Sequence, residues 1–203
     1  MPEIKDLTAR YFLILFTVIS LAGTSTIFPQ TKSNLEIFYS LADSSVNSFI
    51  HSNNPNGNIY TELNNGGTYS VFNSHILGLL QAKGIKPISG KGTDAPQYLY
   101  SVLKASTIYG DVFRDGFLGD FLVKRELVFI GNYFYTGAGL KEFNLLYTDT
   151  VKVEDIKNLE NTSFNFTVGI VPTEPFFSGL FEPIAALGTA AVAVILFFTV
   201  RSR

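Results

Sequence analysis

The C-terminal end of the chain carries an apolar run that constrains everything before it. Residues 184–200 are seventeen residues without a charge, followed by Arg201 and Arg203. A helix of this length extends roughly 25 Å, against about 30 Å for the hydrocarbon core of a bilayer. The run has no polar stripe, which favours a transmembrane helix over a buried core helix. The two arginines then mark the cytoplasmic side, so we expect an extracytoplasmic domain, with membrane lipid as a partner of the helix.

The segment before this run has the composition of a linker. Residues 172–183 contain three prolines, and residues 201–203 form a basic end. A Pro/Glu motif, an apolar helix and a basic tail together resemble C-terminal sorting signals of the exosortase kind, which are processed. Because the motif Thr173-Glu174-Pro175 does not lie directly at the helix, we favour a permanent anchor.

The N-terminal end predicts export. Residues 11–21 form an apolar run of eleven residues, preceded by a polar stretch and followed by Ala22. This is the length of the hydrophobic region of a signal peptide rather than of a full span, and the small residues around Ala22 favour cleavage after it. The alternative is an uncleaved anchor over residues 11–28. Residues 1–28 are therefore a signal peptide or an anchor, and both place the middle of the chain outside the cytoplasm.

Composition excludes several classes of site. The chain has no cysteine, which removes disulfides, thiolate metal sites, a cysteine nucleophile and a lipidated cysteine. Only two histidines are present, which argues against histidine-based catalysis and against a histidine metal cluster. The net charge of −2 argues against a nucleic-acid-binding face. We expect no cofactor, no metal and no nucleic-acid partner.

Two helices and two short strands are predicted in the first half of the domain. Ser33 and Glu36 form a capping box before a helix of about four turns, whose apolar residues recur every three or four positions. A strand over residues 58–63 follows. The second helix is expected to begin at a Thr68 cap and to end at Lys83-Gly84. Its apolar face comprises Tyr69, Phe72, Ile76, Leu79 and Leu80. Residues 85–89 are again typical of a strand.

Longer strands are predicted in the second half. Residues 98–109 and 121–136 alternate and are joined by a loop containing Asp115-Gly116, which predicts a long antiparallel hairpin. Alternation places two sets of side chains of the first strand on opposite faces: Tyr98, Tyr100, Val102 and Ile108 on one, and Leu99, Leu103, Ala105 and Tyr109 on the other. In the second strand it places Phe121, Val123, Leu127, Phe129, Tyr133 and Tyr135 on one face and leaves Lys124 and Glu126 on the other.

The remainder of the domain completes a two-layer architecture. Residues 142–148 predict another strand, residues 153–159 a short helical turn, and residues 164–171 an extended or strand segment. With two helices covering one face of a mainly antiparallel sheet, residues 33–171 are expected to form an α+β two-layer sandwich.

Residues 35–90 resemble the opening of a group of bacterial envelope proteins. The shared pattern is a helix, a short strand, a second helix ending in Leu-x-x-x-Gly, here Leu80 to Gly84, and a further strand. The group comprises proteins of the flagellar FlgO, curli-secretion CsgG (amino-terminal part) and LpoB type. This chain lacks the lipidated cysteine that such proteins often carry. The resemblance implies an accessory protein of the cell envelope, periplasmic if the source is Gram-negative, with an envelope protein as partner and no catalytic residue to transfer.

The loop between the two long strands is the candidate interaction site. It brings together charged and aromatic residues on a rigid sheet, where loops often carry function. These residues are Asp111, Phe113, Arg114, Asp115, Phe117 and Asp120. Carboxylates are the usual ligands of calcium, so a calcium site is one interpretation of this loop. Their spacing does not match an EF-hand, so we favour a solvated hairpin tip.

Other candidate motifs have structural explanations. His51 and His75 have no recognisable nucleophile or acid partner in the sequence and are interpreted as structural. Residues 90–93 lack the spaced glycine and the following helix of a phosphate loop. Two N-glycosylation triplets begin at Asn161 and Asn165; they matter only in a eukaryote.

The sequence therefore predicts a non-enzymatic, membrane-anchored binding or scaffolding protein in an envelope assembly. One alternative is an envelope hydrolase that uses the loop from Asp111 to Asp120. Another is a subunit of a membrane complex in which the helices over residues 11–28 and 184–200 pack on each other or on the membrane spans of partner proteins. Small residues suited to such packing are Gly23, Ala185, Gly188 and Ala191.

Overall fold

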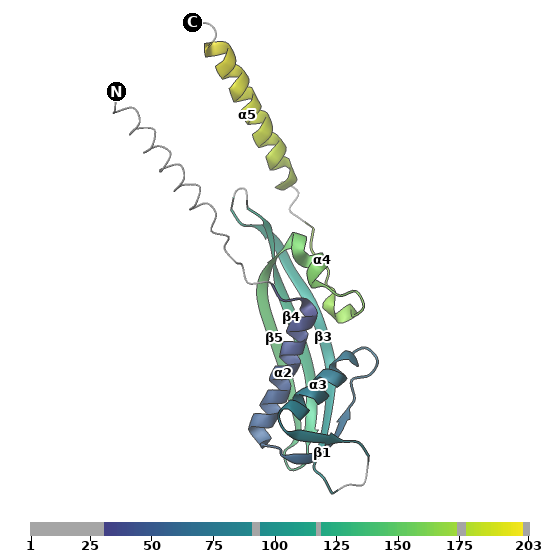
Figure 1. Ribbon diagram of the computed structural model, residues 1–203. Coiled ribbons are helices and arrows are strands. Elements are labelled where there is room, and N and C mark those ends of the chain that lie inside the picture. The colour runs from purple at the N-terminus through teal and green to yellow at the C-terminus, as the bar shows by residue number, and fades with distance from the viewer. Residues whose placement is uncertain (1–30, 91–93, 117–118, 174–177, 201–203) are drawn as a thin grey trace, which may run out of the picture. The chain divides into compact units, whose positions relative to one another are not determined.

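The computed structural model describes residues 31–90, 94–116, 119–173 and 178–200 (Figure 1). By its contacts the chain divides into Met1–Thr31 and Lys32–Arg203. The predicted signal or anchor segment, residues 1–28, lies outside the described residues. The elements in chain order are α2 Asn34–Asn53, β1 Gly57–Leu63, α3 Val71–Ala82, β2 Ile85–Ile88, β3 Gln97–Arg114, β4 Phe121–Tyr135, β5 Gly139–Lys152, η1 Val153–Asp155, α4 Ile156–Leu159, η2 Asn165–Thr167 and α5 Ser178–Val200.

The sheet has five strands in the order β2-β1-β3-β4-β5. β3 and β4 form the predicted antiparallel hairpin, and β5, which includes the predicted strand over residues 142–148, pairs antiparallel with β4. β1 pairs in parallel with both β2 and β3, through four residue pairs on each side. The α+β class is confirmed, and the sheet is mainly antiparallel as predicted, but the two short parallel pairings of β1 make it a mixed sheet. Both parallel connections, from β1 to β2 and from β1 to β3, pass through α3, because parallel strands need a long crossover.

α2 and α3 cover one face of this sheet (Figure 1). The predicted capping box is present, since the Ser33 amide donates to Glu36 and the Ser33 hydroxyl accepts from the Glu36 amide. α2 ends with Asn54 in the left-handed conformation, where its amide donates to the Ile50 carbonyl. The expected Thr68 cap is wrong: α3 begins after Ser70, whose side chain makes no capping bond.

Aromatic rings fill the space between the helices and the sheet. Phe38 of α2 and Phe72 of α3 both pack against Phe129 of β4, with ring centroids 6.2 and 5.3 Å apart. At the other end of α2, Phe49 stacks on Tyr98 of β3 at 4.1 Å. Tilted and edge-to-face contacts of this kind are preferred by aromatic pairs and add to the stabilisation from burial.

β3 is longer than predicted, and its buried face changes at each of the two register shifts in its pairing with β4. A register shift between Val102 and Lys104 inserts an extra residue opposite β4. As a result the buried residues are Tyr98, Tyr100 and Val102 before the shift, and Ala105, Thr107 and Tyr109 after it. The predicted faces of this strand were therefore wrong beyond Val102, because a bulge exchanges the two faces of a strand.

The segment after β5 packs on the same layer as the helices. The helical turn over residues 153–159 is confirmed as η1 and α4, and Ile156 and Leu159 are buried. The predicted strand or extended segment over residues 164–171 forms no strand, although the backbone is extended at Phe164 and at Val168. It contains η2, which is held by a hydrogen bond from the Thr107 hydroxyl to the Phe166 carbonyl.

α5 is a helix of 23 residues with exposed apolar side chains, and it begins at Ser178 rather than at residue 184. Within the described residues no helix is long and apolar enough to cross a membrane, so the predicted C-terminal membrane span is not supported. The predicted span was defined by the uncharged run over residues 184–200. The helix begins six residues earlier and therefore also contains Glu182 and Pro183. The expected lipid contact of this helix depended on the span and is not supported either. Residues 174–177 of the linker and residues 201–203 lie outside the described residues.

Candidate interaction surface

The hairpin between β3 and β4 places the predicted site residues on an exposed tip. Asp111 and Phe113 lie within β3, where Phe113 is 46% exposed, and Arg114 is its last residue. Asp115 and Asp120 are exposed on either side of the turn. The predicted turn is present, with Gly116 at φ +74°, a conformation that favours glycine. Phe117 lies outside the described residues.

Two of these four charged side chains, Arg114 and Asp120, make contacts with neighbouring residues. The Arg114 Nε donates to the Gly119 carbonyl at 3.0 Å, and its guanidinium lies 5.1 Å from the centre of the Phe121 ring. Asp120 forms an ion pair with Lys152 at 2.6 Å. Across the described residues, no three His, Asp or Glu side chains gather in a way that would hold a metal ion. The tip is therefore a charged turn whose side chains stabilise its own shape.

The ion pair with Lys152 joins the hairpin tip to the end of β5. The hydrogen bond from Lys152 to Asp120 and the charge of that carboxylate raise the pKa of the Lys152 ammonium above its ordinary value. Both side chains are exposed, and exposed pairs of this kind contribute little to stability. The ion pair therefore links the hairpin tip to the end of β5 but contributes little to the stability of the fold.

The sheet face opposite the helices is a surface that the sequence analysis did not single out. Apolar side chains of β3, β4 and β5 point away from the helices and line this outer face. They are Leu99, Leu103, Ile108, Val128, Ile130, Phe134, Leu140 and Leu146. Leu103, Ile108 and Leu146 are 58%, 46% and 61% exposed. No described helix packs on this outer face.

The apolar side chains form rows across the strands. Leu99 pairs with Phe134, which pairs with Leu140, and Val128 pairs with Leu146. The alternation of β4 predicted a solvent-facing side from Lys124 and Glu126, and both do lie there. The apolar rows were missed because the bulge in β3 was not foreseen and the strand over residues 142–148 was predicted too short.

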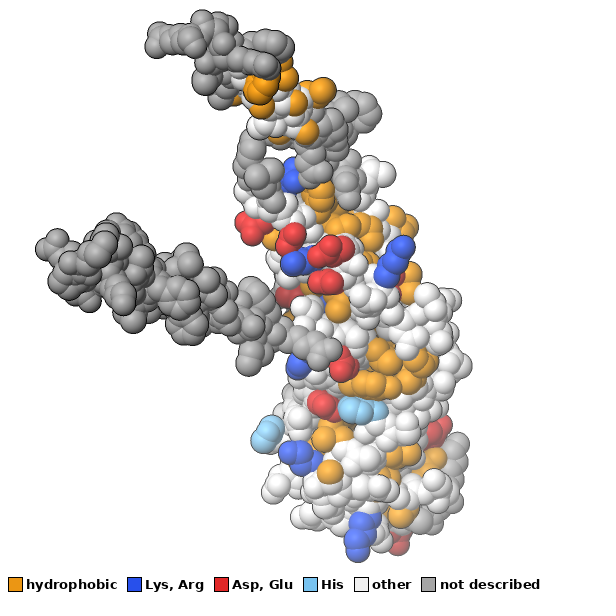
Figure 2. Space-filling model, turned by 45° about the horizontal axis from the view of Figure 1, so that its top comes forward, with side chains coloured by type: hydrophobic (Ala, Val, Ile, Leu, Met, Phe, Trp, Pro, Cys, Tyr) orange, Lys and Arg blue, Asp and Glu red, His pale blue; other side chains and the backbone are white. Residues whose placement is uncertain are grey.

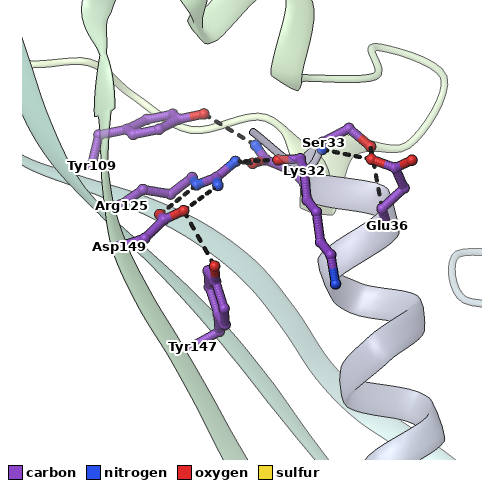
Figure 3. Close-up of polar contacts among 8 residues, drawn as sticks. Lys32, Ser33, Glu36, Tyr109, Arg125, Tyr147 and Asp149 are labelled. Atoms are coloured by element: carbon purple, nitrogen blue, oxygen red, sulfur yellow. Dashed lines mark hydrogen bonds and ion pairs between the residues drawn. The ribbon is translucent and has the colours of Figure 1, made fainter. Parts of the chain in front are cut away.

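A buried arginine lies between the sheet and the start of α2 (Figure 3). Arg125 is 0% exposed and binds both carboxylate oxygens of Asp149, at 2.8 and 2.5 Å. Its Nη1 donates to the Lys32 carbonyl at 3.0 Å and to the Asn34 side-chain oxygen at 2.7 Å. The guanidinium thus ties β4 to β5 and to the N-terminus of α2.

The same cluster continues through two tyrosines. The Asn34 amide donates to the Tyr109 hydroxyl at 3.0 Å and to the Thr167 carbonyl at 2.7 Å. Burial raises the pKa of Tyr109 to about 12, even though the Asn34 bond acts in the opposite direction. The Tyr147 hydroxyl donates to Asp149, and burial together with that carboxylate raises the pKa of Tyr147. The charges of Arg125 and Asp149 are matched within the cluster, so its role is to hold elements together.

A sequence signal for this cluster existed. Arg125 stands in the apolar alternation of β4, between Val123 and Leu127. A charged residue at such a position is buried only when it is paired. The partners themselves come from other elements, and no local pattern identifies them.

His75 contacts an acidic residue that the sequence analysis did not connect with it. Its Nε2 lies 2.6 Å from Asp43 of α2, and its ring stacks on Tyr39 at 4.5 Å. Among the described residues no serine or threonine hydroxyl bonds to this histidine, so the contact links two helices without the geometry of a catalytic triad. His51 is exposed in the last turn of α2.

Charge is distributed without a strong bias on the visible surface. On the face drawn in Figure 2, acidic and basic side chains are interspersed, and basic side chains do not gather into one large patch. A nucleic-acid-binding face usually has such a patch. The apolar outer face of the sheet is a better candidate for recognition of a protein.

Comparisons with known proteins give partial likenesses. No model of a protein family matches the chain, and no curated protein sequence is similar to it. One similar solved structure is the rare lipoprotein B of Shewanella oneidensis, with 8% identity, a TM-score of 0.35, and coverage of 47% of this chain and 68% of that protein. Another is a minor lipoprotein of Acinetobacter baumannii, with 17% identity, a TM-score of 0.29, and coverage of 66% and 93%. Both likenesses are weak and partial, as was the predicted resemblance to envelope proteins of the FlgO, CsgG and LpoB type.

Proposed function

We propose that this protein is a non-enzymatic accessory component of a bacterial cell envelope that binds a protein partner through the outer face of its sheet. The observation that carries the proposal is the set of exposed apolar side chains on three long strands, with no described element covering them. The envelope location is supported by the sequence pattern of residues 35–90 and by the signal-like N-terminal run.

The dimensions of the outer face suit a folded protein partner. The shortest of its three strands has 14 residues, which at about 3.3 Å per residue corresponds to a length of roughly 45 Å. Three strands spaced about 4.8 Å apart give a width of roughly 10–15 Å. The resulting area, roughly 450–680 Å², is somewhat smaller than the about 800 Å² that each partner contributes to a standard protein interface. The expected partner presents a complementary apolar surface.

Site-specific photo-crosslinking in cells tests this proposal. A photoreactive residue at Leu103 reports on the outer face, and one at Lys83 reports on the exposed side of the helix layer. We expect a crosslink to one envelope protein at Leu103 and none at Lys83. Equal crosslinking at the two positions, or none at Leu103, would reject a specific outer-face partner.

Two lysine substitutions in one cross-strand row provide a matched comparison. Ile108 and Thr148 flank Glu126 on either side, and all three side chains point to the outer face. Ile108→Lys removes an apolar contact and should abolish the Leu103 crosslink. Thr148→Lys adds the same charge at a polar position, and most of the Leu103 crosslink should remain.

A second candidate function is a subunit of a larger assembly held by α5. The exposed apolar side chains of this helix, including Ile184, Leu187 and Ile195, favour it. Apolar side chains of this kind are stabilised when they pack against the helix of a partner protein. Removing residues 178–203 should then lower the size of the native complex in gel filtration while the outer-face crosslink persists. An unchanged complex would contradict this role of α5.

A further inference from the structure

β5 is the last strand of the sheet, and its outer edge is unpaired. Its residues pair with β4 from Leu122↔Lys152 to Tyr135↔Gly139 without a register shift, whereas β3 and β4 have two shifts. Among the described residues no other strand bonds to β5. An unpaired edge presents a row of free backbone N–H and C=O groups, which can pair with another strand.

The two edges of the sheet differ in how they are protected. β2 has only four residues and contains Pro87, which cannot donate a backbone hydrogen bond. β5 has 14 residues and no proline, and residues 143–148 within it carry no charge. A long, regular and partly apolar edge is the kind that pairs with another chain.

We propose that two copies of this chain pair antiparallel through β5, about a two-fold axis at Leu145, so that the two five-stranded sheets become one. In this arrangement Leu145 faces Leu145 of the second copy. Phe143 faces Tyr147 of the second copy, and Lys141 faces its Asp149. Each of these last two pairs occurs twice, as two-fold symmetry requires.

The side chains select this register over its neighbours. Residues directly opposite in an antiparallel pair point to the same face, so aromatic residues meet and opposite charges meet. A shift by two residues in one direction would place Phe143 against Asp149. A shift in the other direction would place Lys141 against Tyr147. Asp149 keeps its bond to Arg125 on the β4 side, so the contact with Lys141 serves mainly to set the register.

The helix layer leaves room for the second copy. A two-fold axis perpendicular to the sheet brings the two α2 helices onto the same face, on either side of the new strand pair. Ser40, Ser44 and Ser48 are exposed on α2. Ser40 and Ser44 donate to carbonyls of their own helix, so these short side chains do not obstruct the approach.

Cysteine pairs test the register directly, because the chain has no cysteine of its own. Glu142→Cys and Thr148→Cys are placed in two copies that carry different tags and are expressed together. Both positions are exposed, so the fold is retained. In the proposed register, position 142 of one copy lies opposite position 148 of the other. The two introduced thiols are then within disulfide distance, and mild oxidation should link about half of the protein, the share of mixed dimers expected when the two copies assort at random. Either variant alone places its identical thiols roughly 20 Å apart and should not be linked.

A second pair is the matched control. Glu142→Cys with Thr150→Cys would be linked efficiently only in a register shifted by two residues, so we expect a much lower yield. Absence of the mixed disulfide in the first combination, or equal yields in both, would overturn the proposal. The result is separate from the partner test: linked copies without an outer-face crosslink support the dimer and reject the proposed function, and the reverse result rejects only the dimer.

Discussion

The guanidinium of Arg125 has four described acceptor contacts, and none of its partners is adjacent to it in the chain. Arg125→Gln leaves the Asp149 carboxylate and the acceptors at the start of α2 without a cation. Breaking a buried pair by removing one partner typically costs about 3–5 kcal/mol. Because Asp149 is partly exposed, we expect a loss near the lower end, about 3 kcal/mol. Urea denaturation of the protein, followed by far-UV circular dichroism, measures it.

The neighbouring residue is the control for this prediction. Lys124 points to the outer face and pairs with Glu126, where its side chain is 54% exposed. Lys124→Gln should change the free energy of unfolding by less than about 1 kcal/mol. Similar losses for the two variants would show that the Arg125 cluster does not stabilise the fold.

The hydroxyl of Tyr98 is buried and makes no hydrogen bond, although its ring stacks on Phe49. A buried unsatisfied polar group costs about 1–3 kcal/mol. Tyr98→Phe keeps the ring and removes that group, so this variant should be as stable as the parent or more stable by up to about 1 kcal/mol. The comparison is Tyr100→Phe, which loses a 2.7 Å bond to Ser45 and should be destabilised by about 1 kcal/mol. Thermal unfolding of both variants measures the difference, and a less stable Tyr98→Phe would contradict it.

At the scale of elements, β4 depends on a glycine beneath an aromatic ring. A Cβ on Gly131 would overlap the Phe143 ring of β5 and the Ser101 carbonyl of β3. Gly131→Ala must push two strands apart and should cost about 1–3 kcal/mol, the usual penalty for overpacking. Urea denaturation of the variant measures this loss.

Gly78 in α3 gives the opposite expectation. It is exposed, and a Cβ there meets no atom within 4 Å. Gly78→Ala should therefore stabilise the protein by about 0.5–1 kcal/mol through helix propensity. Equal effects of the two alanine substitutions would mean that strand spacing at Gly131 is less restrictive than the geometry indicates.

Elements also differ in how well the sequence predicted them. The start of α2 follows from Ser33 and Glu36, which lie three residues apart and bond to each other. The inward face of β4 follows from its alternation. The two faces of β3 cannot be assigned from its alternation, because the shift between Val102 and Lys104 depends on how β3 pairs with β4. The candidate site shows the same division: the hairpin turn was predicted, whereas the outer face required the strand pairing.

For the whole molecule, three buried tyrosines predict loss of stability at alkaline pH. Burial raises the pKa of Tyr98 and of Tyr100, and raises that of Tyr109 to about 12. An unfolded tyrosine has a pKa of about 10. Since the folded values are higher, the stabilisation is complete below about pH 10 and is lost as the pH rises toward 12 and beyond. The midpoint of urea denaturation should fall across that range.

Tyr109→Phe isolates one of these groups. The variant lacks the hydroxyl that accepts from Asn34, so it should be less stable at neutral pH. Its stability should also fall less steeply than that of the parent between about pH 10 and 12. Identical slopes for the two proteins would mean that Tyr109 ionises as readily in the folded state as in the unfolded state.

The sequence by itself determined the features that depend on neighbours a few residues apart. These include the capped start of α2, the glycine turn at Gly116 and the alternation of β4. Only the tertiary structure decided the parallel pairing of β1, the change of face in β3, the partners of Arg125 and the uncovered outer face. Asn34 and Arg125 are 91 residues apart, and Asp149 is 24 residues beyond Arg125. Contacts over such separations form because packing brings the elements together, and no local pattern encodes that packing.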